Sequence, residues 1–302
     1  MKYALFLGCT IPARALHYEL SARKVAEKLG IELVDMPGAS CCGMPMVNVN
    51  RHASMVMSAG ALAQAEEMGL NIVTLCSACN STLSEVSEHL RHDKAEREKV
   101  NAELAKAGKK GYKGEAKVVH FSKMLFEAIG PKGLKEKVVK PLKGATFVTH
   151  SGCHYLKPSE VFSKFDDPES PSTLNDLVKA TGATVKTIVN PNECCGGGIL
   201  GIKENTAVSI AAGKLDRIKQ YAGDIDGLVL HCPFCNIQYE AHQKKLERDS
   251  GKSIDIPVLF LPQIIGLALG IPESELGFNQ HKIKPKTLLE KFAPAPEAAP
   301  AQ

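Results

Sequence analysis

The sequence has no long apolar run and no block of charge of one sign. No stretch approaches the roughly 18 apolar residues of a membrane-spanning helix. The N-terminal stretch MKYALFLGCT is too short in apolar length for a secretory signal. The net charge is +4 and no basic run occurs, so nothing indicates a nucleic-acid partner. We therefore expect a cytoplasmic protein without direct membrane insertion.

The cysteine pattern leaves no cysteine unassigned, and it is the most informative feature that is present. All 10 cysteines fall into two copies of the array C…CC…CxxC. The first copy is Cys9, Cys41, Cys42, Cys76 and Cys79, and the second is Cys153, Cys194, Cys195, Cys232 and Cys235. In a reducing compartment such spacings indicate metal or redox chemistry rather than structural disulfides.

The residues that flank the cysteines repeat as well. ASCCGMP (39–45) corresponds to NECCGGG (192–198), and NIVTLCSACN (71–80) to GLVLHCPFCN (227–236). The chain is therefore interpreted as a duplicated domain, with halves of ordinary domain size at 1–143 and 144–290. The tail 291–302 lacks apolar bulk and is predicted to be disordered.

Each half alternates short apolar runs with longer amphipathic ones. The predicted strands are 3–8, 32–36, 71–75 and 117–121 in the first half, and 146–150, 184–189, 227–231 and 257–261 in the second. Predicted helices between them include 14–29, 52–68 and 204–221, and residues 163–172 are interpreted as an inserted loop. This alternation predicts an α/β fold of two Rossmann-like βαβ halves with mostly parallel sheets, related by pseudo-twofold symmetry.

All five cysteines of each half follow the first three predicted strands of that half. In a parallel sheet these positions gather at the carboxyl edge, where open α/β folds bind their ligands. Gly43 follows one cysteine pair and Gly196, Gly197 and Gly198 follow the other. Glycine lets the backbone approach a bulky inorganic group and offers amide donors to its sulfides. We therefore expect distant cysteines to meet at one rim in each half.

Three kinds of site are compatible with this array. A tetrahedral zinc site needs four ligands, so five thiolates exceed what zinc requires. A dithiol redox pair would use only the CxxC of each half and leave six cysteines unexplained. An iron–sulfur cluster accepts thiolates from scattered loops, and a fifth thiolate indicates an unusual cluster. The spacing favours iron–sulfur over zinc, and zinc over thiol exchange.

The doubled arrays CCGMP and CCGGG, each followed by CxxC, resemble the CCG-domain family of cysteine-rich Fe–S proteins, which includes the B subunit of heterodisulfide reductase. The resemblance covers the chain except its tail. It implies two noncubane [4Fe-4S] clusters, one per half, each held by the five cysteines of that half. Similar subunits occur in sulfur-oxidising heterodisulfide-reductase-like, succinate or fumarate, and 2-hydroxy-acid oxidising complexes.

The resemblance also implies an activity and partners. The activity would be reduction of the mixed disulfide of coenzyme M and coenzyme B, an anionic small molecule. The partners would be the A subunit of heterodisulfide reductase, with FAD and Fe–S clusters, and its C subunit, with two [4Fe-4S] clusters. Two other hypotheses stay open at this point, namely a subunit that only passes electrons and a zinc-stabilised scaffold without a redox role.

Histidines and cations near the cysteines are weaker candidates. His154 follows Cys153 and is the best candidate for a proton donor, although a histidine that only hydrogen-bonds sulfide or backbone is an equal alternative. His120, His150 and His231 end predicted strands, where buried structural histidines are favoured. Arg14, Lys157 and Lys203 lie near the cysteine loops, but a solvated surface charge is the favoured interpretation of each.

Overall fold

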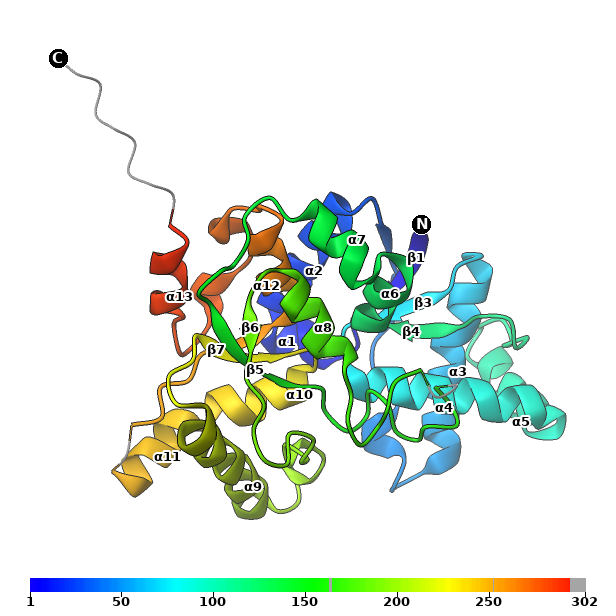
Figure 1. Ribbon diagram of the computed structural model, residues 1–302. Helices are drawn as coiled ribbons and strands as arrows, with labels where there is room; N and C mark the ends of the chain where they lie inside the picture. Colours follow the sequence, from blue (N-terminus) through cyan, green and yellow to red (C-terminus); the bar gives the residue numbers. More distant parts are fainter. Residues whose placement is uncertain (163–164, 252, 294–302) are drawn as a thin grey trace.

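The computed structural model describes residues 1–162, 165–251 and 253–293 and shows two four-stranded parallel sheets (Figure 1). The first sheet has the order β2-β1-β3-β4, with strands Lys2–Phe6 (β1), Glu32–Asp35 (β2), Ile72–Thr74 (β3) and Val118–His120 (β4). The second has the order β6-β5-β7-β8, with strands Thr146–His150 (β5), Thr184–Val185 (β6), Gly227–Leu230 (β7) and Val258–Phe260 (β8). The duplicated α/β fold predicted from the sequence is confirmed.

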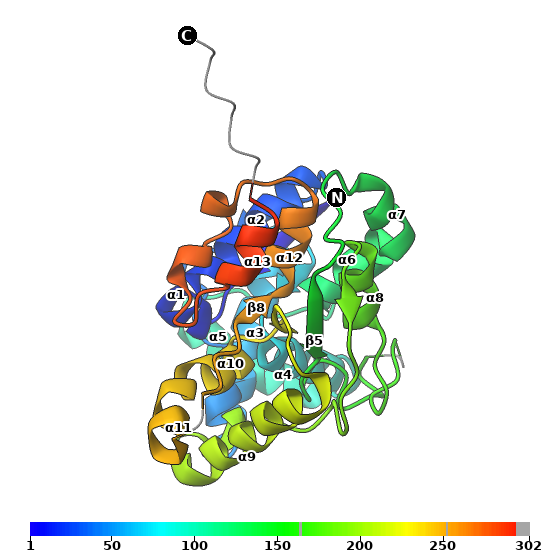
Figure 2. The ribbon, with the colours of Figure 1, turned by 60° about the vertical axis from the view of Figure 1, so that its left-hand side comes forward.

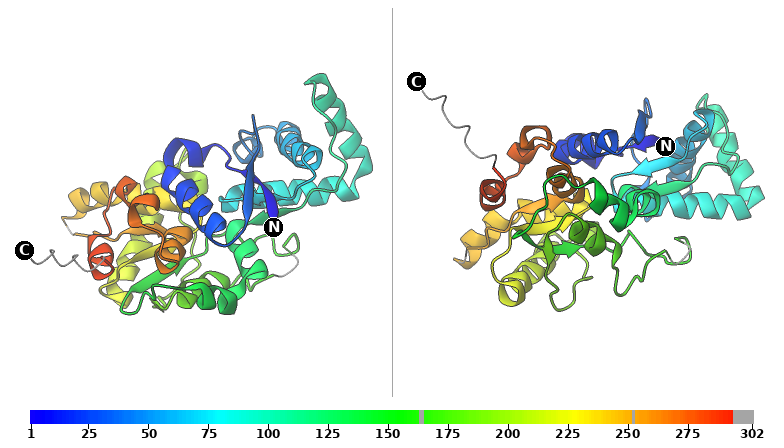
Figure 3. Two further views of the ribbon diagram at one scale, coloured as in Figure 1. Left: turned by 90° about the horizontal axis from the view of Figure 1, so that it is seen from above. Right: turned by 45° about the horizontal axis from the view of Figure 1, so that its top comes forward.

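Helices connect the strands of each sheet. The first half contains Thr10–Arg14 (α1), Leu16–Lys28 (α2), Met44–Met46 (η1), Arg51–Glu67 (α3), Ser77–His92 (α4), Lys94–Lys106 (α5), Phe121–Ala128 (α6) and Gly130–Lys137 (α7). The second half contains Thr173–Ala180 (α8), Gly197–Ile199 (η2), Glu204–Arg217 (α9), Ile218–Ala222 (η3), Pro233–Asn236 (α10), Ile237–Ala241 (η4), Gln243–Ser250 (α11), Leu261–Ala268 (α12), Glu273–Glu275 (η5), Phe278–Gln280 (η6) and Lys286–Lys291 (α13). Helix α5 projects at one end of the molecule (Figure 3).

The strand order places a topological switch point beside the first strand of each half. Strand β1 pairs in parallel with β2 on one side and with β3 on the other, and β5 pairs in the same way with β6 and β7. Connections therefore leave the central strand toward opposite sides of the sheet. A crevice forms at the carboxyl ends of such strands, and ligands bind there in open α/β sheets.

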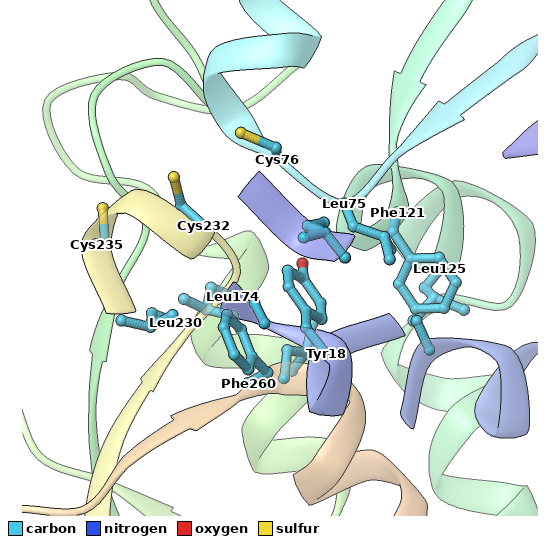
Figure 4. Packing of buried hydrophobic residues seen from close by; sticks show 14 of the residues in the cluster. Tyr18, Leu75, Cys76, Phe121, Leu125, Leu174, Leu230, Cys232, Cys235 and Phe260 are labelled. Carbon is cyan, nitrogen blue, oxygen red and sulfur yellow. The ribbon is translucent and has the colours of Figure 1, made fainter. Parts of the chain in front are cut away.

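The two halves pack against each other through equivalent pairs of helices. Helix α2, which follows the first strand of one half, packs against α12, which follows the last strand of the other (Figure 2). The reciprocal pair, α8 against α6, makes the same contact. The ring of Tyr18 stacks on that of Phe260 at a centroid distance of 4.0 Å, in the core between the halves (Figure 4). This reciprocal packing accounts for the pseudo-twofold arrangement.

Some predicted element bounds are wrong. The strand expected at 184–189 is only the short edge strand β6, because the chain turns at Asn190, whose φ is 53°, and enters Pro191. The helix expected at 14–29 is interrupted at Ala15, where φ is −141° and ψ is 42°. The break separates α1 from α2 and lets α1 begin directly after Cys9.

Parts of two predictions fall outside the described residues. Of the inserted loop 163–172, positions 163 and 164 are not described, and the remainder is a loop in which Asp166 accepts backbone hydrogen bonds from Ser172 and Thr173. Of the tail 291–302, only residues up to 293 are described, and α13 ends at Lys291. The boundary that we propose at 143–144 lies in the loop between α7 and β5. No helix in the described ranges is long and apolar enough to span a membrane.

Candidate metal centres

Every cysteine lies in the segment that follows the carboxyl end of a strand. Cys9 follows β1, the pair Cys41-Cys42 follows β2, and Cys76 and Cys79 follow β3. Cys153, Cys194-Cys195, and Cys232 with Cys235 follow β5, β6 and β7 in the same way. Because the strands of each sheet are parallel, each set of five arrives at one rim. All ten are free thiols in the structure.

One glycine in each half brings the backbone close to a thiol of the CxxC. Gly8, with φ of +66°, sits so close to Cys79 that an added Cβ would lie 2.9 Å from its Sγ. Gly152, with φ of +75°, occupies the matching place, and a Cβ there would lie 3.5 Å from the Sγ of Cys235. A side chain at either position would intrude on the site as well as strain the backbone.

Backbone amides after the cysteine pairs point at sulfur. The Gly43 amide donates to Cys41 Sγ at 3.4 Å, and the Gly196 amide donates to Cys194 Sγ at 3.3 Å. The Gly197 amide adds a further donor to Cys195 Sγ, at 3.4 Å. Such amide donors stabilise thiolates and the sulfides of a cluster. The expectation that glycines after the pairs supply donors is met in both halves.

The five thiols of the first half line one cavity, which holds about 300 Å³ of space outside the protein atoms, open solvent included. The cavity is lined by Leu7, Cys9, Thr10, Cys41, Cys42, Met44, Pro45, Cys76, Ala78, Cys79 and Phe234. Cys9 is exposed and Cys41 half-buried, whereas the other three thiols are buried. The site is thus closed on its protein side and open at one mouth. Phe234 reaches it from the other half.

The second half repeats this arrangement with thiols in direct contact. The Sγ atoms of Cys195 and Cys235 are 3.4 Å apart. One ring nitrogen of His150 lies near these two sulfurs, and the three atoms are within 4.8 Å of one another. Cys194 is exposed and Cys153 half-buried, matching the open mouth of the first site.

Hydrogen bonds between neighbouring thiols lower the pKa of at least one cysteine in each site. The hydrogen bond from Cys41, followed by that from Cys79, lowers the pKa of Cys42 to about 3. Hydrogen bonds from Cys153 and then Cys195 lower the pKa of Cys194 to about 2. Metal ions are bound by thiolates rather than thiols. Five converging sulfurs with amide donors around them fit an iron–sulfur cluster and exceed the ligand number of zinc.

The two sites meet across the interface between the halves. The pKa of Cys76 is raised, chiefly by its hydrogen bond with the Cys232 thiol of the other half. Figure 4 shows the Cys76, Cys232 and Cys235 side chains lying side by side, with Cys76 directed toward the other two. The first cysteines of the two CxxC motifs therefore face each other, and groups bound at the two sites would be neighbours.

A groove opens beside the first site and contains His154. It holds about 1310 Å³ of space outside the protein atoms, open solvent included. It is lined by Met44, Val47, Asn48, Arg51, Ser54, Met55, Ser81, Thr82, Glu85, Val86, His89 and His154. His154 comes from the second half and crosses to α4, where its Nδ1 lies 3.3 Å from Ser81 Oγ. Since Ser81 donates its hydroxyl proton to Glu85, the hydroxyl oxygen is free to accept from His154.

The three basic residues that lie near the cysteine loops in the sequence do not line the groove. Arg14 and Lys203 are exposed, and Lys157 pairs with Glu169 at 2.9 Å. The basic side chains that line the groove are instead Arg51, His89 and His154. No local signal in the sequence marks Arg51, because it starts an ordinary amphipathic helix and faces the groove only once α3 and α4 are packed together.

The three strand-end histidines divide into two kinds. His231 is buried with both ring nitrogens engaged, by Ser122 Oγ at 2.9 Å and by the Ser151 carbonyl at 2.6 Å. His120 Nε2 donates to the His231 carbonyl at 3.1 Å. Burial lowers the pKa of His231 to about 4. These two are structural, as expected. His150 differs, because its Nε2 is buried without a partner among the described residues.

Comparisons with known proteins agree with this geometry. The model of the CCG family, a cysteine-rich domain, matches residues 3–84 and 147–240. The chain is 36% identical over 92% of its length to a protein of Archaeoglobus profundus that is named as similar to the B subunit of heterodisulfide reductase, and 94% of that protein is covered. It is 33% identical to the B subunit of the ferredoxin/F(420)H(2)-dependent CoB-CoM heterodisulfide reductase of Methanosarcina acetivorans, with 96% of this chain and 97% of that protein covered.

Two further similarities extend the range of relatives. The chain is 32% identical to the membrane anchor of the 8-methylmenaquinol:fumarate reductase of Wolinella succinogenes, over 93% of this chain and 97% of that protein. A crystal structure of a hypothetical protein from Helicobacter pylori superposes with a TM-score of 0.74 at 19% identity, which shows a shared fold. That alignment covers 94% of this chain but only 52% of the H. pylori chain.

Proposed function

This chain belongs to the CCG family of cysteine-rich domains and to the family of heterodisulfide reductase B subunits, and from that premise we propose that it is an iron–sulfur oxidoreductase component. More specifically, we propose that it is the catalytic subunit of a heterodisulfide reductase, which reduces the coenzyme M–coenzyme B disulfide to two thiols. Its cofactors would be two noncubane [4Fe-4S] clusters, one per half.

One observation carries the proposal: two five-thiol sites face each other through Cys76 and Cys232. The ligands would be Cys9, Cys41, Cys42, Cys76 and Cys79 in the first half, and Cys153, Cys194, Cys195, Cys232 and Cys235 in the second. Cleaving a disulfide to two thiols takes two electrons and two protons. Two adjacent one-electron centres match the electron count of this reaction, and that chemistry is what the clusters would supply when bound.

The groove beside the first site suits an anionic substrate. Arg51 and His89 line it from α3 and α4, beside polar side chains such as Thr82 and Glu85 and apolar ones such as Met44 and Val86. A guanidinium at the rim would pair with a sulfonate, carboxylate or phosphate of the substrate. The groove also leads to Met44, which lines the thiol cavity.

His154 is the proposed proton donor to a departing thiolate. Its Nδ1 is oriented by Ser81, which is held in turn by Glu85. This leaves Nε2 as the ring nitrogen without a hydrogen bond to any described residue, on a side chain that lines the groove. A protonated ring in this orientation can deliver a proton to a developing thiolate and then recover it from solvent through the open groove.

The proposed partners follow from the relatives. Two of them are named after the B subunit of heterodisulfide reductase, so this chain is proposed to work in a complex. We propose as partners the A subunit of heterodisulfide reductase, with FAD and Fe–S clusters, and its C subunit, with two [4Fe-4S] clusters that deliver electrons. Because all ten cysteines are free thiols, we also propose a reducing compartment, the cytoplasm.

A second function is favoured by one relative. The chain is 32% identical to one component of a menaquinol:fumarate reductase, so the same fold also serves a complex with another substrate. In that case the clusters would only pass electrons, as they would in a sulfur-oxidising or 2-hydroxy-acid oxidising complex. The groove would then be no substrate site, and changing its residues would leave electron transfer intact.

The test is anaerobic purification of the full chain followed by metal analysis and turnover. We expect about eight irons with matching acid-labile sulfide, against about two zincs for a scaffold protein. Reduction of the coenzyme M–coenzyme B disulfide by a reduced viologen dye would identify the catalytic subunit. Full iron content without disulfide turnover would favour the electron-transfer alternative, and zinc without iron would exclude both.

A further inference from the structure

The two sites have equivalent thiols but different surroundings. Three buried positions around the second site carry polar side chains where the first half has apolar ones. The matched pairs are His150 and Phe6, Lys214 and Ala61, and Tyr239 and Leu83. The register of these pairs follows the cysteines and the helices after them, since Gly213 precedes Lys214 as Gly60 precedes Ala61. The difference therefore belongs to the second site and not to a different fold.

Lys214 is an unusual residue to find in this position. It is 0% exposed and is the only lysine or arginine among the buried described residues. Its Nζ donates to His150 Nδ1 at 3.2 Å and to the carbonyl oxygen of Pro191. Burying an ammonium group is costly unless it meets acceptors or negative charge. Burial lowers the pKa of Lys214 to about 8, and the nearby Cys235 and Cys195 oppose this shift.

The hydrogen bond from Lys214 fixes the proton of His150. An ammonium group only donates, so Nδ1 of His150 must accept, and the ring proton resides on Nε2. Nε2 has no partner among the described residues although it is buried. A Cβ built on Gly152 would lie 3.5 Å from Cys235 Sγ and 4.0 Å from His150 Nε2, so the sulfur and this nitrogen both border the space over Gly152. The unpaired N–H therefore lies at the edge of the second site.

The same tautomer argues against His150 as a metal ligand. Its ring nitrogen lies within 4.8 Å of the Cys195 and Cys235 sulfurs, so the three form a conceivable ligand set. Ligation through Nε2 requires that this nitrogen be deprotonated and that Nδ1 donate to its neighbour. Lys214 offers Nδ1 a donor and no acceptor, which favours the opposite tautomer. His150 is thus positioned to donate to sulfur.

Tyr239 completes the group. Its ring meets that of His150 edge to face at a centroid distance of 5.0 Å. Its hydroxyl is buried and has no partner among the described residues. The hydroxyl is therefore a second unpaired polar group beside the site, where the first half has the apolar Leu83.

We propose that Lys214 and His150 raise the reduction potential of the second centre above that of the first. Reduction adds negative charge to a cluster, and a buried cation with an N–H donor at its sulfurs stabilises that charge. Phe6 and Ala61 offer neither in the first half. An electron shared between the adjacent centres would thus reside in the second half. This inference rests on the proposed iron–sulfur function and adds the direction in which an electron would move, from the first centre to the second.

The test is a redox titration of the anaerobically purified full chain, followed by EPR and visible absorption. Cys41→Ser and Cys194→Ser variants assign each signal to a half. The Lys214→Met and His150→Phe variants give the second site apolar side chains, as at the matched positions of the first site. For Lys214→Met we expect about a tenfold fall in the reduced-to-oxidised ratio of the second centre at fixed potential, which is about 59 mV for one electron. Lys219→Met, at an exposed lysine, is the matched control.

The outcomes separate this inference from the function on which it rests. A wild-type chain without iron would remove the proposed function itself. Iron-replete variants with two unchanged potentials would overturn only the inference, as would equal shifts of both centres. Loss of the second centre from both variants would also overturn it, because the pair would then hold the site rather than set its potential. A shift confined to the second centre, absent in Lys219→Met, would support it.

Discussion

The two halves of this protein share a backbone plan and differ in what surrounds their thiols. Strand order, the left-handed glycine before the first cysteine, and the amide donors after the cysteine pair are the same in both. The second site adds a buried lysine and two polar groups that have no partner among the described residues, and the first site lies beside the groove that His154 lines. The same arrangement of five cysteines therefore occurs in two different chemical environments, so the surroundings can change while the thiol geometry is kept.

The largest expected effect tests whether both halves are needed. Replacing Cys76 or Cys232 by serine removes a thiolate from one site and disturbs the thiol pair that joins the sites. We expect loss of iron from the altered half and a fall in disulfide turnover by more than about a hundredfold in each case, since even outer-shell changes at metal sites reach that size. Iron content and viologen-linked turnover measure this. Full activity after loss of either cysteine set would contradict the expectation that both halves are needed.

His154 has Thr10 as its matched position in the first half, directly after the first cysteine. We expect His154→Gln to lower turnover by about a hundredfold, the lower range for loss of a general acid, with unchanged iron. Thr10→Ala, the matched variant, alters the thiol cavity and not the groove, so any effect of it should appear as a change in iron content. Equal effects of both changes would indicate a merely structural role for each residue.

Arg51 and Glu204 occupy matched positions at the starts of α3 and α9, with opposite charge. If the substrate anion binds only beside the first half, Arg51→Met should raise KM about tenfold with little change in kcat, because about 1.4 kcal/mol of pairing is lost. Glu204 is exposed and pairs with Lys245 at 3.9 Å, so Glu204→Gln should leave KM unchanged. Steady-state kinetics decides, and an unaltered KM in Arg51→Met would remove the groove as the anion site.

The smallest expected effect compares the two glycines. Both have positive φ, so alanine costs roughly 1–2 kcal/mol of folding free energy at either position. Gly8→Ala should cost more than Gly152→Ala, because its Cβ would lie 2.9 Å from Cys79 Sγ against 3.5 Å from Cys235 Sγ. Chemical denaturation of the two variants, with iron content as a second readout, measures the difference. A larger loss of stability in Gly152→Ala than in Gly8→Ala would show that the first site accommodates the added methyl group more easily than the second.

Much of the fold was predictable because its signals are local. Apolar runs marked the strands, and longer amphipathic runs marked most of α2 and α3. The errors fall where local signals compete with packing. The edge strand β6 ends at Val185, ahead of the turn at Asn190, and the helix predicted from residue 14 breaks at Ala15, which separates α2 from the short helix α1 that begins at Thr10.

The convergence of the cysteines was predictable from the sequence, whereas the surroundings of the candidate site were not. Five cysteines after three parallel strands must arrive at one rim, so their convergence needed no tertiary information. Arg51 and Lys214 carry no such signal, because each sits in an ordinary helix. Lys214 would have been expected on the surface, where lysine normally lies. Only the burial of α9 against the second site shows its role.

The sequence by itself determined the duplication, the order of the elements and the inventory of thiols, because spacing and periodicity act within one half at a time. The tertiary structure decided how the halves meet. The contact between Cys76 and Cys232 and the passage of His154 to α4 depend on how the two halves pack, whereas the rest of the groove wall depends on packing α3 against α4. Such packing joins residues far apart in the chain through the shapes of buried surfaces, which no local pattern encodes.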